Sequence, residues 1–185
     1  MELFIDFELN ILKLFSHISC PILDKLMIFV SATGNLGIIW IFFGTILLFF
    51  KNYRKCGICV LLSLLLCLIV GNITLKPLIA RTRPFNIDKT ISLLISAPTD
   101  FSFPSGHTLS SFASATASVY SKNKYIYIPA FIYAFLIAFS RLYLQVHFVT
   151  DVLAGVILGL ILGFISIKTT EKKLCWHKVT HSFCF

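Results

Sequence analysis

The chain has 185 residues, of which 57% are hydrophobic and 13% are charged. Soluble domains carry about 25% charged residues, so this composition excludes an ordinary soluble domain and favours a chain surrounded by lipid. The formal net charge is +8. Because the basic residues gather between apolar stretches, membrane topology accounts for them, and we expect no nucleic-acid partner.

Residues 1–20 are predicted to form an amphipathic helix lying in the membrane interface. Charged residues alternate with apolar side chains that recur at helical spacing, namely Leu3, Phe4, Phe7, Ile11, Leu14, Phe15 and Ile18. No basic stretch precedes a short apolar core, so the segment does not resemble a signal peptide. A short sixth membrane span is the alternative interpretation.

Five apolar runs follow, each near the length of about 20 residues that crosses a bilayer. The predicted spans are Leu26–Phe50, Cys56–Ile79, Pro104–Tyr120, Tyr125–Arg141 and Phe148–Ile167. The first contains Gly34-Asn35, so we expect it either to be broken there or to begin with an interfacial piece. The predicted fold is therefore all-α: a single integral membrane helical bundle over residues 22–168, with about five spans and a tail at 169–185.

Three basic clusters predict the orientation of this bundle. They follow the first, third and fifth spans and comprise Lys51, Arg54, Lys55, Lys122, Lys124, Lys168, Lys172, Lys173 and Lys178. Positive charge collects in cytoplasmic loops. We therefore expect a multi-pass protein of the cell membrane with a cytoplasmic C-terminus, and loops Thr82–Phe103 and Leu142–His147 on the outer face.

The six cysteines do not indicate a secreted disulfide framework. In the tail, four residues have spacings compatible with a zinc site: Cys175, His177, His181 and Cys184. We favour the other interpretation, a disordered basic tail without a metal, and keep zinc as the alternative.

Three polar clusters converge on the outer face of the predicted bundle. The first, "KPLIARTRP", places Lys76 and Arg83 at the end of the second span. These cations are expected on the outer face, whereas positive charge usually collects on the cytoplasmic side. Their position therefore favours an anion-binding site over side chains that merely extend to the membrane surface. The second is Pro104-Ser105-Gly106-His107. Ser105 is predicted to cap the third span, and Gly106 would let an anion approach free backbone N–H groups.

The third cluster, "SRLYLQVHFVTD", contains Arg141, His147 and Asp151. A helical turn would place His147 and Asp151 on one side, where the carboxylate could fix the tautomer of the imidazole. Beyond it, Gly155, Gly159 and Gly163 repeat every four residues and predict a close-packing face. Two histidines, three cations and one carboxylate on one face suit phosphoryl transfer.

Together, the three clusters resemble the signature of the type 2 phosphatidic acid phosphatase superfamily, over about residues 22 to 168. The resemblance implies a membrane phosphatase acting on lipid phosphates or diphosphates. His147 would be the nucleophile, Asp151 its orienting carboxylate and His107 the general acid. The phosphate would be held by Lys76, Arg83, Ser105, Gly106 and Arg141. Arg81 has no role in that pattern.

We expect no cofactor and no metal, because acidic residues near the clusters are too few and too dispersed for a carboxylate cage. Among possible substrates we favour undecaprenyl diphosphate, with phosphatidylglycerophosphate as the alternative. Two other functions remain open: a phosphotransferase using the same site, and a transporter or lipid-phosphate binder that needs only the cations. The sequence does not indicate an oligomeric state.

Overall fold

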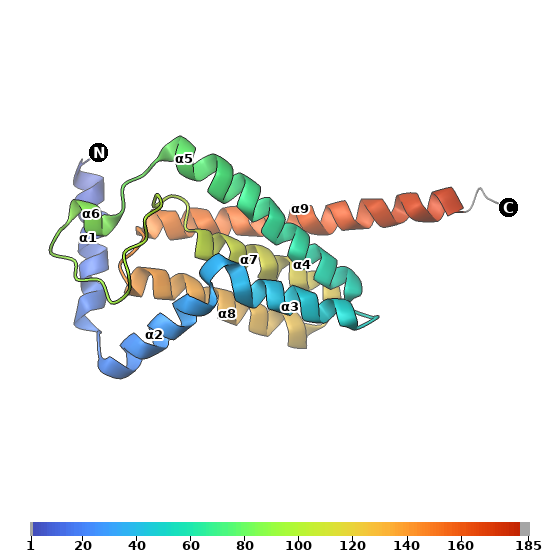
Figure 1. The fold of residues 1–185 in the computed structure, drawn as a ribbon, viewed down its shortest axis with the longest axis horizontal. Helices are drawn as coiled ribbons and strands as arrows, with labels where there is room; N and C mark the ends of the chain where they lie inside the picture. Colours follow the sequence, from blue (N-terminus) through green and yellow to red (C-terminus); the bar gives the residue numbers. More distant parts are fainter. Residues whose placement is uncertain (1, 182–185) are drawn as a thin grey trace.

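The computed structural model describes residues 2–181, and for Glu2, Ser16 and residues 173–181 it describes the backbone alone. All the regular secondary structure of the described residues is helical, and the longer helices form a bundle (Figure 1). Helix α1 (Glu2–His17) crosses one end of this bundle, whereas α9 (Val149–His181) runs along it. The predicted all-helical bundle with a separate N-terminal helix is therefore confirmed.

Helices α2 (Pro21–Thr33) and α3 (Ile38–Phe49) form a bent pair with an angle of 50° between them. A short 3₁₀ turn, Asn35–Gly37, separates the two helices. Leu36 and Gly37 have φ values of 52° and 69°, so the chain leaves the right-handed helical region at this point. The predicted break is confirmed.

Helix α4 (Arg54–Cys67) passes without interruption into a π-helical stretch, Leu68–Leu75, and then into α5 (Lys76–Ile79). Ala80 ends this run in the left-handed conformation, and its N–H donates to the carbonyl oxygen of Lys76. Helix α6 (Pro84–Ile87) follows after a short loop. The cations of the first cluster therefore lie where the long helical run stops.

Helix α7 (Gly106–Ser118) packs against α4, α8 (Lys124–Tyr143) and α9, and ends in a 3₁₀ turn, Val119–Ser121. Its contact with α9 is close because α9 presents glycines. A Cβ atom added at Gly155, Gly159 or Gly163 would lie 3.0, 2.8 or 2.6 Å from a backbone oxygen of residues 105–113. The predicted close-packing face of α9 is confirmed.

In the described part of the chain, three helical segments are long and apolar enough to span a membrane, and the bent pair α2–α3 would be a fourth. These three segments are Arg54–Ile87, Lys124–Tyr143 and Val149–Lys172. The predicted third span, Pro104–Tyr120, falls short because its helix α7 has 13 residues, many of them Ser, Ala and Thr. It is an inner helix, shielded by its neighbours.

The backbone of α9 is helical to His181. The tail side chains of Cys175, His177 and His181, and the whole of Cys184, lie outside the described residues. The zinc alternative for the tail therefore remains a hypothesis.

Candidate active site

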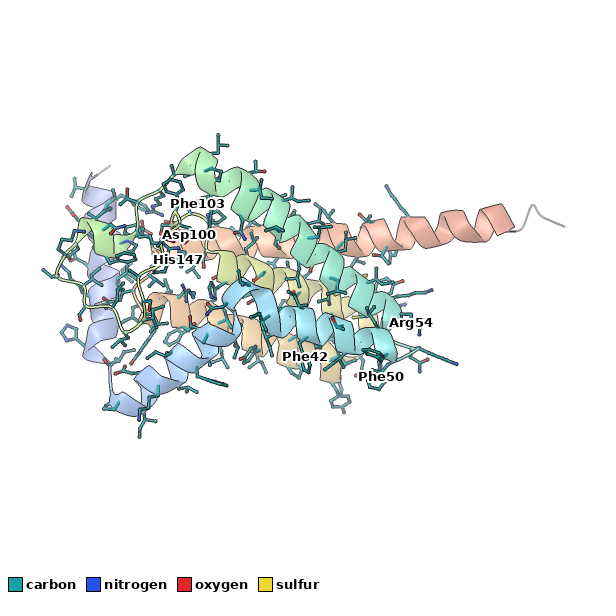
Figure 2. All side chains as sticks on the ribbon, viewed as in Figure 1. Phe42, Phe50, Arg54, Asp100, Phe103 and His147 are labelled. Carbon is teal, nitrogen blue, oxygen red and sulfur yellow. The ribbon has the colours of Figure 1, made fainter. Side chains whose placement is uncertain are left out.

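Six of the eight predicted site residues line one cavity of about 360 Å³: Lys76, Arg83, Gly106, His107, Arg141 and His147. They come from α5, the loop before α6, α7, α8 and the loop between α8 and α9. Figure 2 shows His147 and Asp100 toward the end of the bundle that α1 crosses. The remaining two residues, Ser105 and Asp151, are fully buried.

The imidazole of His147 is buried and held in one tautomer. Its Nδ1 lies 2.8 Å from the backbone oxygen of Ser102. Because a carbonyl oxygen only accepts, the proton is on Nδ1 and Nε2 carries the lone pair. Nε2 in turn lies 3.4 Å from Nη1 of Arg83, which donates to it. In this tautomer Nε2 is the unprotonated nitrogen of His147.

Burial, together with the positive charges of Arg141 and Arg83, lowers the pKa of His147 from 6.5 to about 4, although Asp151 acts in the opposite direction. Desolvation disfavours the imidazolium, and nearby cations add to that effect. The imidazole is therefore neutral at physiological pH, which is the state that can attack an electrophile.

Asp151 does not contact His147 in the way that the i,i+4 spacing predicted. Its Oδ2 is 3.7 Å from Nδ1 of His147, too far for a hydrogen bond. Instead Oδ2 accepts from Oγ of Ser102 at 2.5 Å and from the backbone N–H of Phe148 at 2.9 Å. The reason is that His147 precedes α9, which begins at Val149. Asp151 is thus linked to the imidazole by hydrogen bonds through Ser102, a residue that the motifs did not indicate.

Arg83 is almost fully buried and firmly held. Its Nη1 donates to the backbone oxygen of Val146 at 2.7 Å, and its Nε donates to the backbone oxygen of Asp100 at the same distance. Its Nη2 pairs with the carboxylate of Asp100 at 2.5 Å. This guanidinium is fixed before any ligand binds, as electrostatic preorganisation requires.

Asp100, which sequence reasoning did not select, also pairs with Lys76. Its pKa is raised by burial but lowered more strongly by Lys76 and Arg83, so that the net value is about 2. The carboxylate therefore stays ionised and shares the two cations. A phosphate that binds in this cavity must compete with it.

Arg141 is 3% exposed and donates to the hydroxyl of Ser31. Its Nε is buried and has no hydrogen-bond partner among the described residues. An unsatisfied guanidinium donor is costly in a protein interior, so it favours an anionic ligand in the adjoining cavity.

The start of α7 departs in one detail from expectation. Ser105 occupies the N-cap position, but its side chain does not cap the helix. Its Oγ instead accepts from the hydroxyl of Thr108 at 3.0 Å, a bond that satisfies Thr108 in a fully buried position. The backbone N–H groups of the first turn, including that of Gly106, thus remain free of a side-chain cap. Such groups attract anions.

His107 lies at the same helix end, with Nε2 2.9 Å from Oδ1 of Asn35. An amide oxygen is an acceptor, so Nε2 of His107 carries a proton that can be donated. Asn35 stands in the break between α2 and α3, so this break brings a hydrogen-bond acceptor next to His107. The sequence predicted this break without linking it to His107.

A second cavity, of about 420 Å³, shares Lys76, Asp100, Gly106 and His107 with the first. Beyond these residues it runs along apolar side chains of α3, α4 and the start of the π-helical stretch, namely Ile41, Leu61, Leu64, Leu65 and Leu68. The polar cavity therefore continues into an apolar groove.

The part of the chain with described side chains contains no group of three or more His, Cys, Asp or Glu residues placed to hold a metal ion. The positive charge at the cavity is supplied by Lys76, Arg83 and Arg141. Whether the reaction is independent of metal ions stays a prediction.

A helical membrane bundle that brings two histidines and three cations to one cavity defines a class of membrane proteins that handle phosphate. Comparison of the sequence with known families agrees: the pattern of the PAP2 superfamily matches residues 57–175. The chain belongs to the PAP2 superfamily. The resemblance inferred from the three motifs is thereby confirmed.

Individual relatives are similar over most of the chain. An undecaprenyl-diphosphatase of Sulfolobus acidocaldarius is 35% identical over 124 residues, which cover 67% of this chain and 59% of that protein. The crystal structure of a PAP2-type phosphatidylglycerolphosphate phosphatase from Bacillus subtilis has a TM-score of 0.73 at 29% identity, covering 90% of this chain and 86% of the other. LpxE of Aquifex aeolicus has a TM-score of 0.71 at 30% identity, covering 86% and 94%.

Proposed function

We propose that this protein hydrolyses a membrane lipid phosphate or diphosphate through a phosphohistidine at His147. The observation that carries the proposal is the state of that residue. Its Nδ1 is bonded to the carbonyl oxygen of Ser102, and the residue lines a cavity with Lys76, Arg83 and Arg141. A neutral imidazole facing three cations suits attack on a bound phosphate.

In the first step, Nε2 of His147 forms a bond to phosphorus while the bond from phosphorus to the leaving oxygen breaks. His107, in its imidazolium form, donates its Nε2 proton to that oxygen and is left as a neutral imidazole. In the second step the oxygen of a water molecule bonds to phosphorus while the bond from phosphorus to Nε2 of His147 breaks. His107 takes a proton from that water, and inorganic phosphate leaves. Both histidines then return to their starting states.

The phosphate oxygens are proposed to be held by Lys76, Arg83, Arg141 and the backbone at Gly106. Charge spreads over these oxygens in the transition state, so fixed cations and N–H donors stabilise it. Ser105 is assigned to the same phosphate-binding segment through its backbone position, since its hydroxyl is bonded to Thr108. Asp100 must release Lys76 and Arg83 as the phosphate enters.

The lipid chain is proposed to lie in the apolar groove between α3 and α4, which joins the polar cavity at His107. Undecaprenyl diphosphate is the first candidate substrate, supported by the similarity to an undecaprenyl-diphosphatase. Phosphatidylglycerophosphate is the second, supported by the likeness to the Bacillus subtilis phosphatase.

In the membrane, we place the site on the extracytoplasmic face and the C-terminus in the cytoplasm. Figure 2 shows Arg54, from a basic cluster, at the opposite end of the bundle from His147. We assign α1 to the interface and count α7 as a fifth, inner membrane segment, which neighbouring helices separate from lipid.

The test is phosphate release by the purified protein in detergent, measured on undecaprenyl diphosphate, phosphatidylglycerophosphate and phosphatidic acid. We expect release that persists in excess chelator and is inhibited by vanadate. An acceptor lipid added to the reaction separates hydrolysis from phosphate transfer through the products formed. Binding of all three lipids without release would identify a lipid-phosphate binder and overturn the proposal.

A further inference from the structure

Arg81 lies outside the phosphate-binding pattern, yet its guanidinium contacts several residues next to the site. Its Nη1 donates to Oδ1 of Asp151 and to the hydroxyl of Thr150, each at 2.6 Å. Its guanidinium lies over the ring of Phe148, 4.1 Å from the centroid. Arg81 therefore contacts three residues in the segment that directly follows His147.

The other end of this guanidinium is held by the N-terminal helix. Nη2 of Arg81 pairs with Oε2 of Glu8 at 2.5 Å, and Glu8 is 2% exposed. The second oxygen of Glu8 accepts from the backbone N–H of Thr150 at 2.9 Å and from its hydroxyl at 2.8 Å. Thr150 is in the first turn of α9, so a carboxylate from α1 caps that helix.

The carboxylate of Asp151 is consequently divided between two partners. Oδ1 is taken by Arg81, while Oδ2 receives Ser102 and Phe148. A carboxylate bonded on both oxygens cannot rotate, and its charge is partly neutralised by the guanidinium. Ser102 is the residue whose carbonyl oxygen fixes Nδ1 of His147.

We propose that Arg81 is a positioning residue for the reaction, acting through Asp151 and Ser102 on His147, and that Glu8 of α1 holds Arg81 in place. The proposal rests on the proposed function of His147. Arg81 touches no reacting atom in this scheme. Its two effects are to fix the direction of the Asp151 carboxylate and to limit the negative charge that reaches the imidazole.

The experiment measures kcat, KM and the pH dependence of kcat/KM for dioctanoyl phosphatidic acid in detergent micelles. The variants are Arg81→Gln, Arg81→Lys, Glu8→Gln and the double variant Glu8→Gln/Arg81→Gln. The double variant leaves no unpaired Glu8 charge, so it keeps the test decisive if Arg81→Gln alone folds poorly. The matched control is Asp6→Asn, which removes an exposed acid from the same helix.

For Arg81→Gln we expect kcat to fall by about 10–100-fold and KM to stay unchanged. Losses of this size are typical when a residue that orients a ligand-contacting side chain is removed. The acidic limb of kcat/KM should move to higher pH, because Asp151 then acts on His147 without its cation. Arg81→Lys keeps the positive charge but loses the planar guanidinium that donates to several acceptors at once. It should therefore lower kcat and leave the acidic limb of kcat/KM at its original pH. The double variant should show the same shift of the acidic limb. Its fold-loss of kcat should be smaller than the product of the fold-losses in the two single variants.

A loss of kcat in Arg81→Gln with an unmoved limb would show a merely structural role and overturn the proposal. Wild-type kinetics in the double variant would do the same. Failure of the proposed function is a separate result: the unmodified protein would then release no phosphate from any lipid tested.

Discussion

His147 illustrates how the surroundings of a residue determine its chemistry. An exposed histidine is partly protonated near neutral pH. Here burial and two arginines lower the pKa of the imidazole to about 4, and the carbonyl oxygen of Ser102 fixes its tautomer. The side chain is therefore unprotonated on Nε2 before a substrate arrives.

This state predicts an unusually low acidic limb for the activity. The nucleophile is active when neutral and is lost as pH falls through its pKa. We expect kcat/KM of the free enzyme to decline near pH 4 rather than near 6.5, once the ionisation of the substrate is corrected for. Profiles measured with two substrates of different phosphate pKa provide that correction. A limb at the ordinary histidine pKa would contradict the buried, neutral assignment.

His107 gives a different prediction, because its contribution to the rate of the first step depends on the leaving group. An alkoxide leaves poorly without a proton, whereas a nitrophenolate needs little help. His107→Ala should therefore slow the first step far more for a lipid monophosphate than for an activated aryl phosphate. The expected difference is about 10²–10⁴-fold, the usual contribution of general acid catalysis.

Single-turnover release of the leaving group is the appropriate measurement for His107→Ala. It separates the first step from breakdown of the phosphohistidine, which also involves His107. Equal losses for both substrates would remove His107 from the general-acid role.

The residues of the three motifs could be predicted because each motif lies at a helix end on the same face of the bundle. Their exact contacts could not. The spacing of His147 and Asp151 assumed a helical turn, but α9 begins only after His147. Glu8 contacts Thr150 from 142 positions away, and no local pattern reveals such a pair.

At the level of helices, the contact between α7 and α9 sets the position of the site. The glycines of α9 let its backbone approach α7, whose first turn carries Gly106 and His107. Helical periodicity was enough to predict this face. It did not show that α7 has only 13 residues, because the apolar run from Pro104 to Tyr120 extends past both helix ends.

Gly159→Val tests this packing. The new Cβ would lie 2.8 Å from the backbone oxygen of Leu109 and 2.8 Å from Cβ of Phe112, so α7 must move. Overpacking of this kind destabilises by about 1–3 kcal/mol. We expect a lower Tm in detergent and reduced activity. The control is Leu160→Val on the adjacent, exposed side of α9, and equal Tm values for the two variants would contradict the close-packing account.

For the whole molecule, the basic clusters and the site define a direction across the membrane. Figure 2 shows Arg54 and His147 toward opposite ends of the bundle. Sequence composition predicts this polarity, since positive charge marks the cytoplasmic side.

Cysteine labelling in intact cells tests the orientation. The native exposed Cys20 and the tail cysteines are first replaced by serine. A membrane-impermeant maleimide should then reach Lys89→Cys, but should reach Lys51→Cys or Lys172→Cys only after permeabilisation. All three positions are exposed in the protein. Reversed accessibility would place the site on the cytoplasmic face.

The central claim is that His147 attacks phosphorus, and His147→Gln tests it most directly. Glutamine keeps a polar side chain but supplies no nucleophilic nitrogen. The measurement is leaving-group release from an activated aryl phosphate in a single turnover, where general acid help is least needed. We predict a loss of about 10⁴–10⁶-fold, the scale seen when a catalytic nucleophile is removed. Release at the unmodified rate by a folded His147→Gln protein would contradict the claim.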